Sequence, residues 1–206
     1  TAELHCRPRL THSALAVALL AWSLAPRAWA QEEAPARPLR ASPLLQEKIA
    51  PEVRNQLPVF VRGDRIEGQA DVNAVVEGNA ELRRGDTVIR ADRLEYTVPE
   101  DLAQARGHVR MNRAGNVYEG SALHLRVEAF EGFFSDARYR FLATEGHGES
   151  TRADFIDAAR SVVHQATYTT CQHDETESWQ PDWVLRAERI HLDTEEQVGV
   201  AENARL

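Results

Sequence analysis

The chain has 206 residues, 27% of them charged, and a formal net charge of −8 at pH 7. This length suits one domain of ordinary size, or slightly more. The acidic balance argues against a nucleic-acid partner, whose phosphates require a basic protein surface. Beyond the N-terminal region, no segment approaches the roughly 20 apolar residues of a transmembrane helix.

Residues 1–30 have the organisation of a secretory signal peptide, with a cationic start, a short apolar stretch and a small-x-small cleavage site. Ala28 and Ala30 are the small residues of that site. We therefore expect an exported protein whose mature chain begins at Gln31. Cys6 precedes the apolar stretch and would be removed with the signal peptide.

The next segment, 31–57, is expected to be a flexible lead, because it is rich in proline and charge at its start. A short helix is possible between residues 42 and 57, although Pro51 interrupts the pattern. From residue 58 to residue 206, short β-rich runs alternate with Gly, Asn and Asp every eight to twelve residues. This spacing is typical of an all-β sandwich, roll or barrel.

An internal repeat organises this β-rich region. Residues 78–96 align without a gap on residues 107–125, an offset of 29, and a shorter third copy begins at 186. Each unit reads as strand, tight turn, strand, with Gly85 and Gly115 inside the two turns. Repeated hairpins of this kind predict a roll or solenoid of stacked units.

Strand alternation predicts one apolar face and one wet face for these hairpins. Arg93 and His124, for example, fall on the wet parity. Such a roll either fills its interior with side chains, which is the commoner outcome, or leaves a groove for an apolar ligand. Alternation and aromatic content assign the following residues to the interior: Leu82, Val88, Leu94, Tyr96, Val109, Met111, Val117, Leu123, Leu125, Phe130 and Phe134.

No catalytic signature is present, and no enzyme activity or cofactor is expected. The sequence has no nucleophile elbow, phosphate-cradling glycine loop or helically spaced histidine pair. Cys171, His173 and Asp174 suggest a metal site, but zinc needs three or four ligands, usually as spaced pairs. Solvated surface carboxylates are the favoured interpretation of the many acidic residues.

Three further features allow more than one interpretation. The aromatic cluster at 130–141 is either core or a ligand surface, and Trp179 and Trp183 either cap an open end of the roll or contact another protein. Cys171 is the single cysteine of the expected mature chain. It is either a buried inert thiol, or it forms a disulfide with another protein or with sequence outside this chain.

Six segments follow one another in an order that resembles the LptD family of lipopolysaccharide (LPS)-assembly outer-membrane proteins, from about Leu39 to Leu206. The TTC motif followed by PDW is the most specific feature, because the related periplasmic bridge protein LptA shares the repeat but lacks this segment. The resemblance implies an OstA/LptA-type β-jellyroll, an open roll of repeated antiparallel hairpins. The segments are PVFVRGDRIEGQ (58–69), VVEGNAELRRGDTVIRADRLEY (75–96), FEGFFSDARYRF (130–141), ATYTTC (166–171), PDWVLRAERIHLD (181–193) and VGVAENARL (198–206).

The same resemblance implies a non-enzymatic function in LPS transport and assembly at the outer membrane. The roll, on the periplasmic side, would receive LPS from an LptA-type bridge and pass it to an outer-membrane barrel that an LptE-type lipoprotein plugs. Rolls of this family join edge to edge, so Val59, Phe60 and Val61 are the expected docking edge. The family also implies that Cys171 is bonded to a cysteine of the barrel, beyond residue 206. An LptA-like bridge protein, a carbohydrate-binding β-domain and an unrecognised hydrolase are the alternatives.

Overall fold

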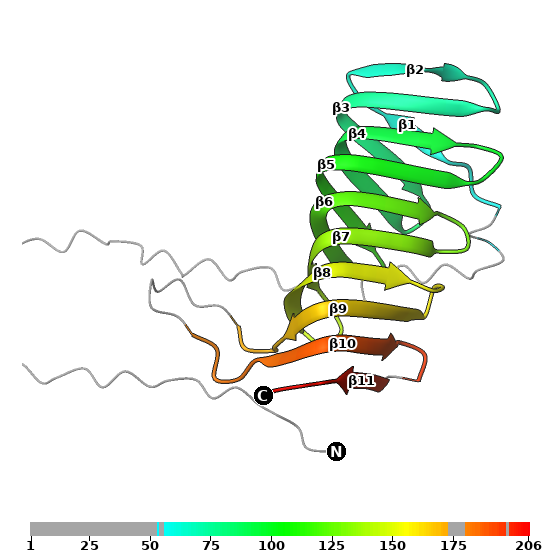
Figure 1. Ribbon diagram of the computed structural model, residues 1–206. Coiled ribbons are helices and arrows are strands. Elements are labelled where there is room, and N and C mark those ends of the chain that lie inside the picture. The colour runs from blue at the N-terminus through cyan, green and yellow to red at the C-terminus, as the bar shows by residue number, and fades with distance from the viewer. Residues whose placement is uncertain (1–52, 54–55, 173–179, 197) are drawn as a thin grey trace, which may run out of the picture.

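The computed structural model describes residues 53, 56–172, 180–196 and 198–206 (Figure 1). In this part of the chain, the strands form a single 11-stranded antiparallel sheet, which confirms the predicted all-β fold. The strands are β1 (Phe60–Arg62), β2 (Arg65–Gln69), β3 (Asn73–Arg84), β4 (Thr87–Thr97), β5 (Leu102–Arg113), β6 (Asn116–Arg126), β7 (Glu131–Arg140), β8 (His147–Phe155), β9 (Arg160–Tyr168), β10 (Leu185–Asp193) and β11 (Val198–Glu202).

The strands from β3 to β11 pair in sequence order, each with the next. β1 and β2 both pair with β3: β1 lies opposite Glu81–Arg83, and β2 lies opposite Asn73–Glu77. Together they form one interrupted edge strand at the upper end of the stack in Figure 1, and β11 forms the lower edge. Phe60 and Val61, two of the predicted docking residues, therefore do lie on a sheet edge, and Val59 immediately precedes it.

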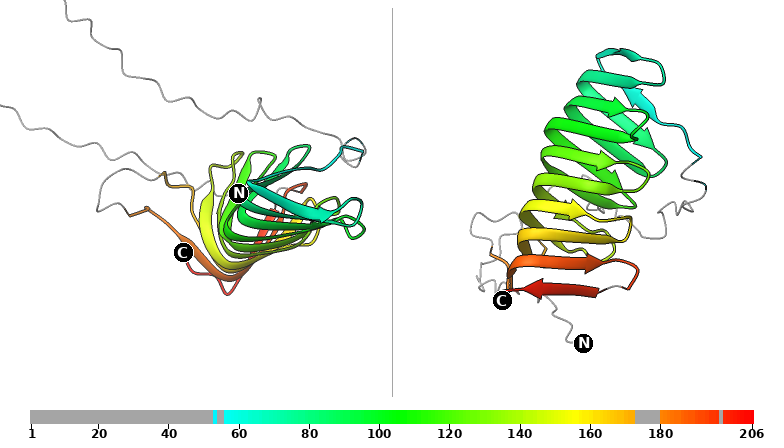
Figure 2. Two further views of the ribbon diagram at one scale, coloured as in Figure 1. Left: turned by 90° about the horizontal axis from the view of Figure 1, so that it is seen from above. Right: turned by 45° about the vertical axis from the view of Figure 1, so that its right-hand side comes forward.

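The sheet is rolled because its long strands bend at the same level. Figure 2 (left) looks down the stack and shows the two halves of each strand folded toward one another. The bend is built by Gly78 and Gly107, which have φ of 70° and 74° and are 29 residues apart. A Cβ added at Gly107 would lie 2.3 Å from Oδ2 of Asp92, so this close approach and the left-handed backbone both require glycine. The repeat seen in the sequence is thus the repeat of the bend.

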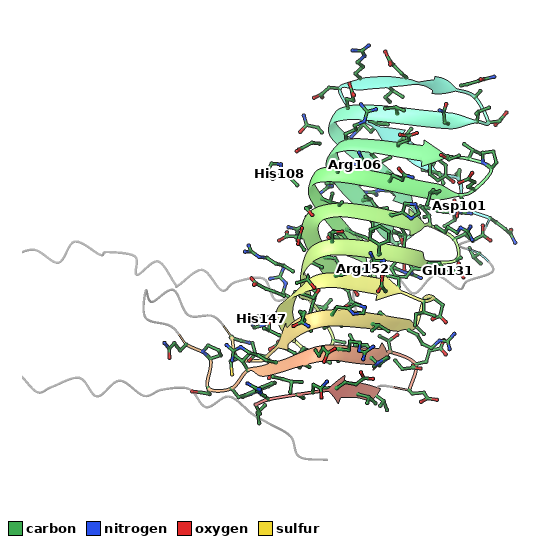
Figure 3. The ribbon with its side chains drawn as sticks, viewed as in Figure 1. Asp101, Arg106, His108, Glu131, His147 and Arg152 are labelled. Atoms are coloured by element: carbon green, nitrogen blue, oxygen red, sulfur yellow. The ribbon has the colours of Figure 1, made fainter. Side chains whose placement is uncertain are left out.

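Polar side chains tie the bend of one strand to its neighbour. The bend residues Asn79 and His108 also have positive φ, and each contacts a carboxylate on the adjoining segment. Asn79 Nδ2 donates to Asp64 Oδ2 at 3.0 Å, and His108 Nδ1 lies 2.8 Å from Asp92 Oδ2. Figure 3 shows His108 projecting outward at this bend. These contacts occupy the outer surface and leave the inner face apolar.

The bend also explains two errors in the predicted interior. Val88 and Val117 are only half-buried, and each is paired across the sheet with an exposed arginine, Arg83 and Arg140 respectively. The neighbouring Ile89 is fully buried instead. β4 and β6 shift their alternation by one residue at the bend, where the strand register is irregular, so the two halves of each strand have opposite parity. The alternation predicted from the sequence lacks this shift, so it assigns Val88 and Val117 to the wrong face.

The two open ends of the folded strands form two rims that face each other across a seam. The first rim carries the turns that join β2 to β3, β4 to β5, β6 to β7, and β8 to β9. The second rim carries the turns that join β3 to β4 and β5 to β6, which are the two hairpin turns predicted at Gly85 and Gly115. In Figure 3, Asp101 marks the first rim, on the side opposite His108.

Several expectations lie outside the described residues. They concern the signal peptide at 1–30 with Cys6, nearly all of the lead at 31–57 with its possible helix, and Trp179. Within the described part, no helix is long and apolar enough to cross a membrane.

Candidate functional site

The inner face of the roll is a continuous apolar core. Nine of the residues assigned to the interior have at most 8% of their surface exposed, and Leu82, Leu94, Met111, Leu125 and Phe134 have none. Phe130 and Phe134, from the aromatic cluster, both lie in this core. The middle of the roll is therefore filled by side chains, which was the commoner outcome expected from the pattern. The nine residues are Leu82, Leu94, Tyr96, Val109, Met111, Leu123, Leu125, Phe130 and Phe134.

The core opens into a cavity at the β1–β2 end of the roll. This mouth cavity has a volume of about 610 Å³ and lies between the edge strand and the first hairpin. Ile66 and Val98, which line it, remain 50% and 41% exposed, although both are apolar. The apolar side chains that line the mouth are Leu57, Val59, Val61, Ile66, Ala70, Ala74, Tyr96 and Val98.

An ion-pair cluster bridges the seam beside the mouth. Arg84, at the end of β3 on the second rim, places Nη1 3.0 Å from Asp101 Oδ1 and Nη2 3.3 Å from Glu128 Oε2, both on the first rim. Tyr96 donates its hydroxyl to the same Asp101 oxygen at 2.5 Å, and the Glu128 backbone N–H donates to Asp101 Oδ2 at 2.6 Å. Asp101 is therefore held by three groups at once.

A second arginine bridges the seam one repeat further along. Arg113 ends β5 as Arg84 ends β3, and its guanidinium carbon lies 3.5 Å from the centre of the Phe130 ring on the first rim. The two residues line a smaller cavity of about 210 Å³ together with Tyr118, Phe155 and the turn after β8. Stacking of this kind is a favourable cation–π contact.

Three tyrosines of the interior have raised pKa values. Burial raises the pKa of Tyr118 to about 12, although the nearby Arg113 opposes the shift. Burial also raises the pKa of Tyr96, with a further contribution from its hydrogen bond to Asp101. The pKa of Tyr139 is raised by burial, and its hydroxyl donates to the Thr167 carbonyl at 2.5 Å. All three are therefore neutral at physiological pH.

The outer face is charged and laced by cross-strand ion pairs. Arg90 Nε lies 2.8 Å from Glu81 Oε2, and this hydrogen bond is the main cause of the lowered pKa of Glu81. At the lower edge, Arg189 Nε lies 2.9 Å from Glu202 Oε2. Among the described residues, no three His, Cys, Asp or Glu side chains are placed to hold a metal ion. Two members of the zinc set considered above, His173 and Asp174, lie outside those residues.

Cys171 is 3% exposed and disulfide-bonded in this structure. The bond that the family resemblance implies, to a cysteine beyond residue 206, stays a prediction. The Cys171 backbone N–H donates to Thr169 Oγ1 at 3.1 Å, and Thr169 Oγ1 in turn donates to the Trp183 carbonyl at 2.8 Å. The Trp183 ring lies 6.1 Å from that of Tyr168, so Trp183 packs beside β9 and Cys171 on the second rim.

Sequence reasoning missed Arg84 and Arg113 as residues of the interior. Charged residues are almost never fully buried unless they are paired, so their type argued for the surface. Their signal was positional: both immediately precede the hairpin turn of their repeat unit, 29 residues apart. Because the two arginines occupy the same point of the structural repeat, both lie at the seam.

Comparison with known proteins identifies the family of this roll. The family described as "LptA/(LptD N-terminal domain) LPS transport protein" matches residues 61–198, which is most of the chain. The chain belongs to this LptA/LptD N-terminal family. The resemblance inferred from the six sequence segments is confirmed.

The relatives of this LptA/LptD-type chain are much longer than the chain itself. It is 65% identical to the LPS-assembly protein LptD of Acidovorax sp. (strain JS42) over 179 residues, 85% of this chain and 22% of that protein. It is 52% identical to LptD of Albidiferax ferrireducens over 212 residues, 99% of this chain and 26% of that protein. The chain thus spans about a quarter of the length of these relatives and matches only their N-terminal part.

One solved structure matches the roll at low sequence identity. This is LptH, described as the LptA homologous periplasmic component of the LPS transport device of Pseudomonas aeruginosa. It is 16% identical, with a TM-score of 0.30, over 71% of this chain and 82% of that one. The family assignment therefore depends on the sequence match alone.

Proposed function

We propose that the roll is a non-enzymatic LPS conduit, which holds the acyl chains of LPS against its apolar interior and passes the lipid toward the outer membrane. The observation that carries this proposal is the mouth cavity, because it joins the solvent to the core through exposed apolar side chains. Its volume lies within the range of small-molecule sites, roughly 300–1,000 Å³. Each methylene group buried there contributes about 0.8 kcal/mol.

The rest of the transport chain belongs to the same proposal. The relatives are named as LPS-assembly proteins, and the family as an LPS transport family. On this basis an LptA-type bridge protein delivers LPS at the edge strand, and the outer-membrane part of the longer protein, with an LptE-type lipoprotein, receives it. The roll itself lies on the periplasmic side of the outer membrane.

Charge placed in the mouth is expected to weaken LPS binding. Ile66→Asp and Val98→Asp each replace an apolar side chain of the cavity wall with a carboxylate, and we expect each to weaken LPS binding at least tenfold, or about 1.4 kcal/mol. Both positions are partly exposed, so the fold should persist. Val200→Asp, at an exposed apolar position on β11, is the matched control. Equal LPS affinity of all four proteins in an equilibrium binding titration would contradict the conduit.

The edge strand is the proposed docking site for the bridge protein. A sheet edge presents unpaired backbone groups to which another strand can pair. Phe60 is 63% exposed, whereas Val59 and Val61 pack against the core, so one face of this edge already continues the apolar interior. The alternative is that Arg62, Asp64 and Arg65 merely protect the edge from aggregation.

A proline in the edge strand tests this docking. Val61→Pro removes one backbone N–H, and we expect it to lower the amount of bridge protein recovered in a pull-down. Val200→Pro makes the same change on the opposite edge and should leave recovery unchanged. Circular dichroism checks that both variants keep the β-fold. Undiminished recovery with Val61→Pro would refute the edge assignment.

A further inference from the structure

Arg84 and Arg113 stand apart from the other charged side chains. Among the residues that the structure describes, they are the only charged residues that are buried, and each is 8% exposed. Arg84 is the last residue of β3 and Arg113 the last residue of β5, and each lines a cavity that has both apolar and polar side chains in its wall. They are separated by two strand spacings, about 9–10 Å. Two guanidinium groups thus follow one another along the seam, at the border between the apolar interior and solvent.

The partners of Arg84 differ in how firmly they are held. The Asp101 carboxylate accepts hydrogen bonds from Tyr96 and from the backbone of Glu128, as well as from Arg84. The Glu128 carboxylate is 46% exposed and contacts Arg84 at 3.3 Å. An incoming anion could replace Glu128 beside Arg84 and leave Asp101 in place.

Arg113 is positioned by stacking. Its guanidinium group lies over the Phe130 ring, and the hydrogen-bond donors of a guanidinium lie in its own plane. This contact holds the guanidinium group in place beside the seam. Such preorganisation lowers the entropy lost when a planar fork binds an anion.

We propose that Arg84 and Arg113 bind the phosphate groups of a phosphorylated lipid whose chains enter the cavities that these two arginines line. This inference rests on the proposed function and adds the recognition of the polar head to it. An amphiphile with its chains inside the roll must place its head where the chains leave the apolar region, and that place is the seam. Arginine matches phosphate because its fork donates two parallel charge-assisted hydrogen bonds. Glu128 occupies this position on Arg84 when no lipid is bound.

Binding of two probes to the 206-residue chain tests the proposal. The probes are bisphosphorylated lipid A and the same lipid A without its phosphates, and the variants are Arg84→Gln/Arg113→Gln and Glu128→Gln. The double variant should bind the phosphorylated probe at least tenfold more weakly and the dephosphorylated probe as the unmodified protein does. Glu128→Gln should bind the phosphorylated probe about threefold to tenfold more tightly, because the competing carboxylate is gone. Arg110→Gln, which removes an exposed arginine paired with Glu119 on the outer face, should change neither affinity.

The outcomes separate this inference from its alternatives. If Arg84 and Glu128 only lock the seam, both variants break the same lock, and both probes respond equally and in the same direction. That result overturns the phosphate site and leaves the conduit intact. If the unmodified chain binds neither probe, the conduit itself fails, and the phosphate site fails with it. If the double variant does not fold, Glu128→Gln decides alone: no gain for the phosphorylated probe refutes the site.

Discussion

Phe134→Ala is expected to lower the free energy of unfolding by about 3–5 kcal/mol, which is the usual cost of removing a buried phenylalanine. Phe134 has no exposed surface and lies on β7 in the middle of the core, with its ring 6.4 Å from that of Tyr118. The packed neighbours cannot fill the vacated volume, so a cavity is added to the loss of apolar burial. Equilibrium denaturation with urea measures the change.

The adjacent residue provides the control. Phe133 points to the opposite face, where its ring is stacked on His124 at 5.4 Å and covered by Arg152 at 4.0 Å. Phe133→Ala should cost about 1 kcal/mol or less, because only surface contacts are lost. Equal costs for the two substitutions would mean that β7 does not present one face to a core, and the roll described here would be wrong.

Alkaline pH is expected to destabilise the fold steeply, beginning near pH 10. The pKa values of Tyr96, Tyr118 and Tyr139 are raised in the folded protein, whereas an unfolded tyrosine titrates near 10. Below pH 10 both states keep the phenolic protons, so these groups have no effect. Above it the unfolded chain loses protons that the folded chain retains, and stability falls by about 1.4 kcal/mol per pH unit for each tyrosine, or about 4 for all three.

Tyr118→Phe isolates one third of this effect. The pKa shift of Tyr118 has burial as its main cause, and it should act between pH 10 and about pH 12. We expect the variant to be within about 1 kcal/mol of the unmodified protein at pH 8 and to lose stability less steeply above pH 10. Urea denaturation at pH 8, 10 and 11 gives the slopes. An unchanged slope in Tyr118→Phe would show that this hydroxyl titrates normally in the folded state.

The sequence predicted the roll and most of its interior because the repeat carries both. The offset of 29 residues placed Gly78 and Gly107 at equivalent positions, and strand alternation placed residues such as Leu82 and Leu123 in the core. Strand alternation gave the wrong face for Val88 and Val117, because the alternation persists only while the strand register is regular. A bend shifts that register, and one residue of shift exchanges the two faces of a strand.

The polar features of the site could not be predicted in the same way. Arg84 is buried because Asp101 and Glu128 reach it from turns 17 and 44 residues further along the chain, and no local pattern contains these contacts. Cys171 raised a question of pairing that spacing alone does not answer. Hydrophobic periodicity reports which face is buried, whereas contacts across the seam depend on how the sheet rolls.

Photo-crosslinking in cells tests the conduit most directly. A crosslinking amino acid is introduced at the inward positions Ile89, Leu94 and Leu123, and at the outward positions Val88, Arg93 and His124. We expect LPS adducts from the inward set alone, so that Ile89 gives an adduct and its neighbour Val88 does not. Adducts from the outward set only, or from both sets equally, would contradict an LPS path through the interior of the roll.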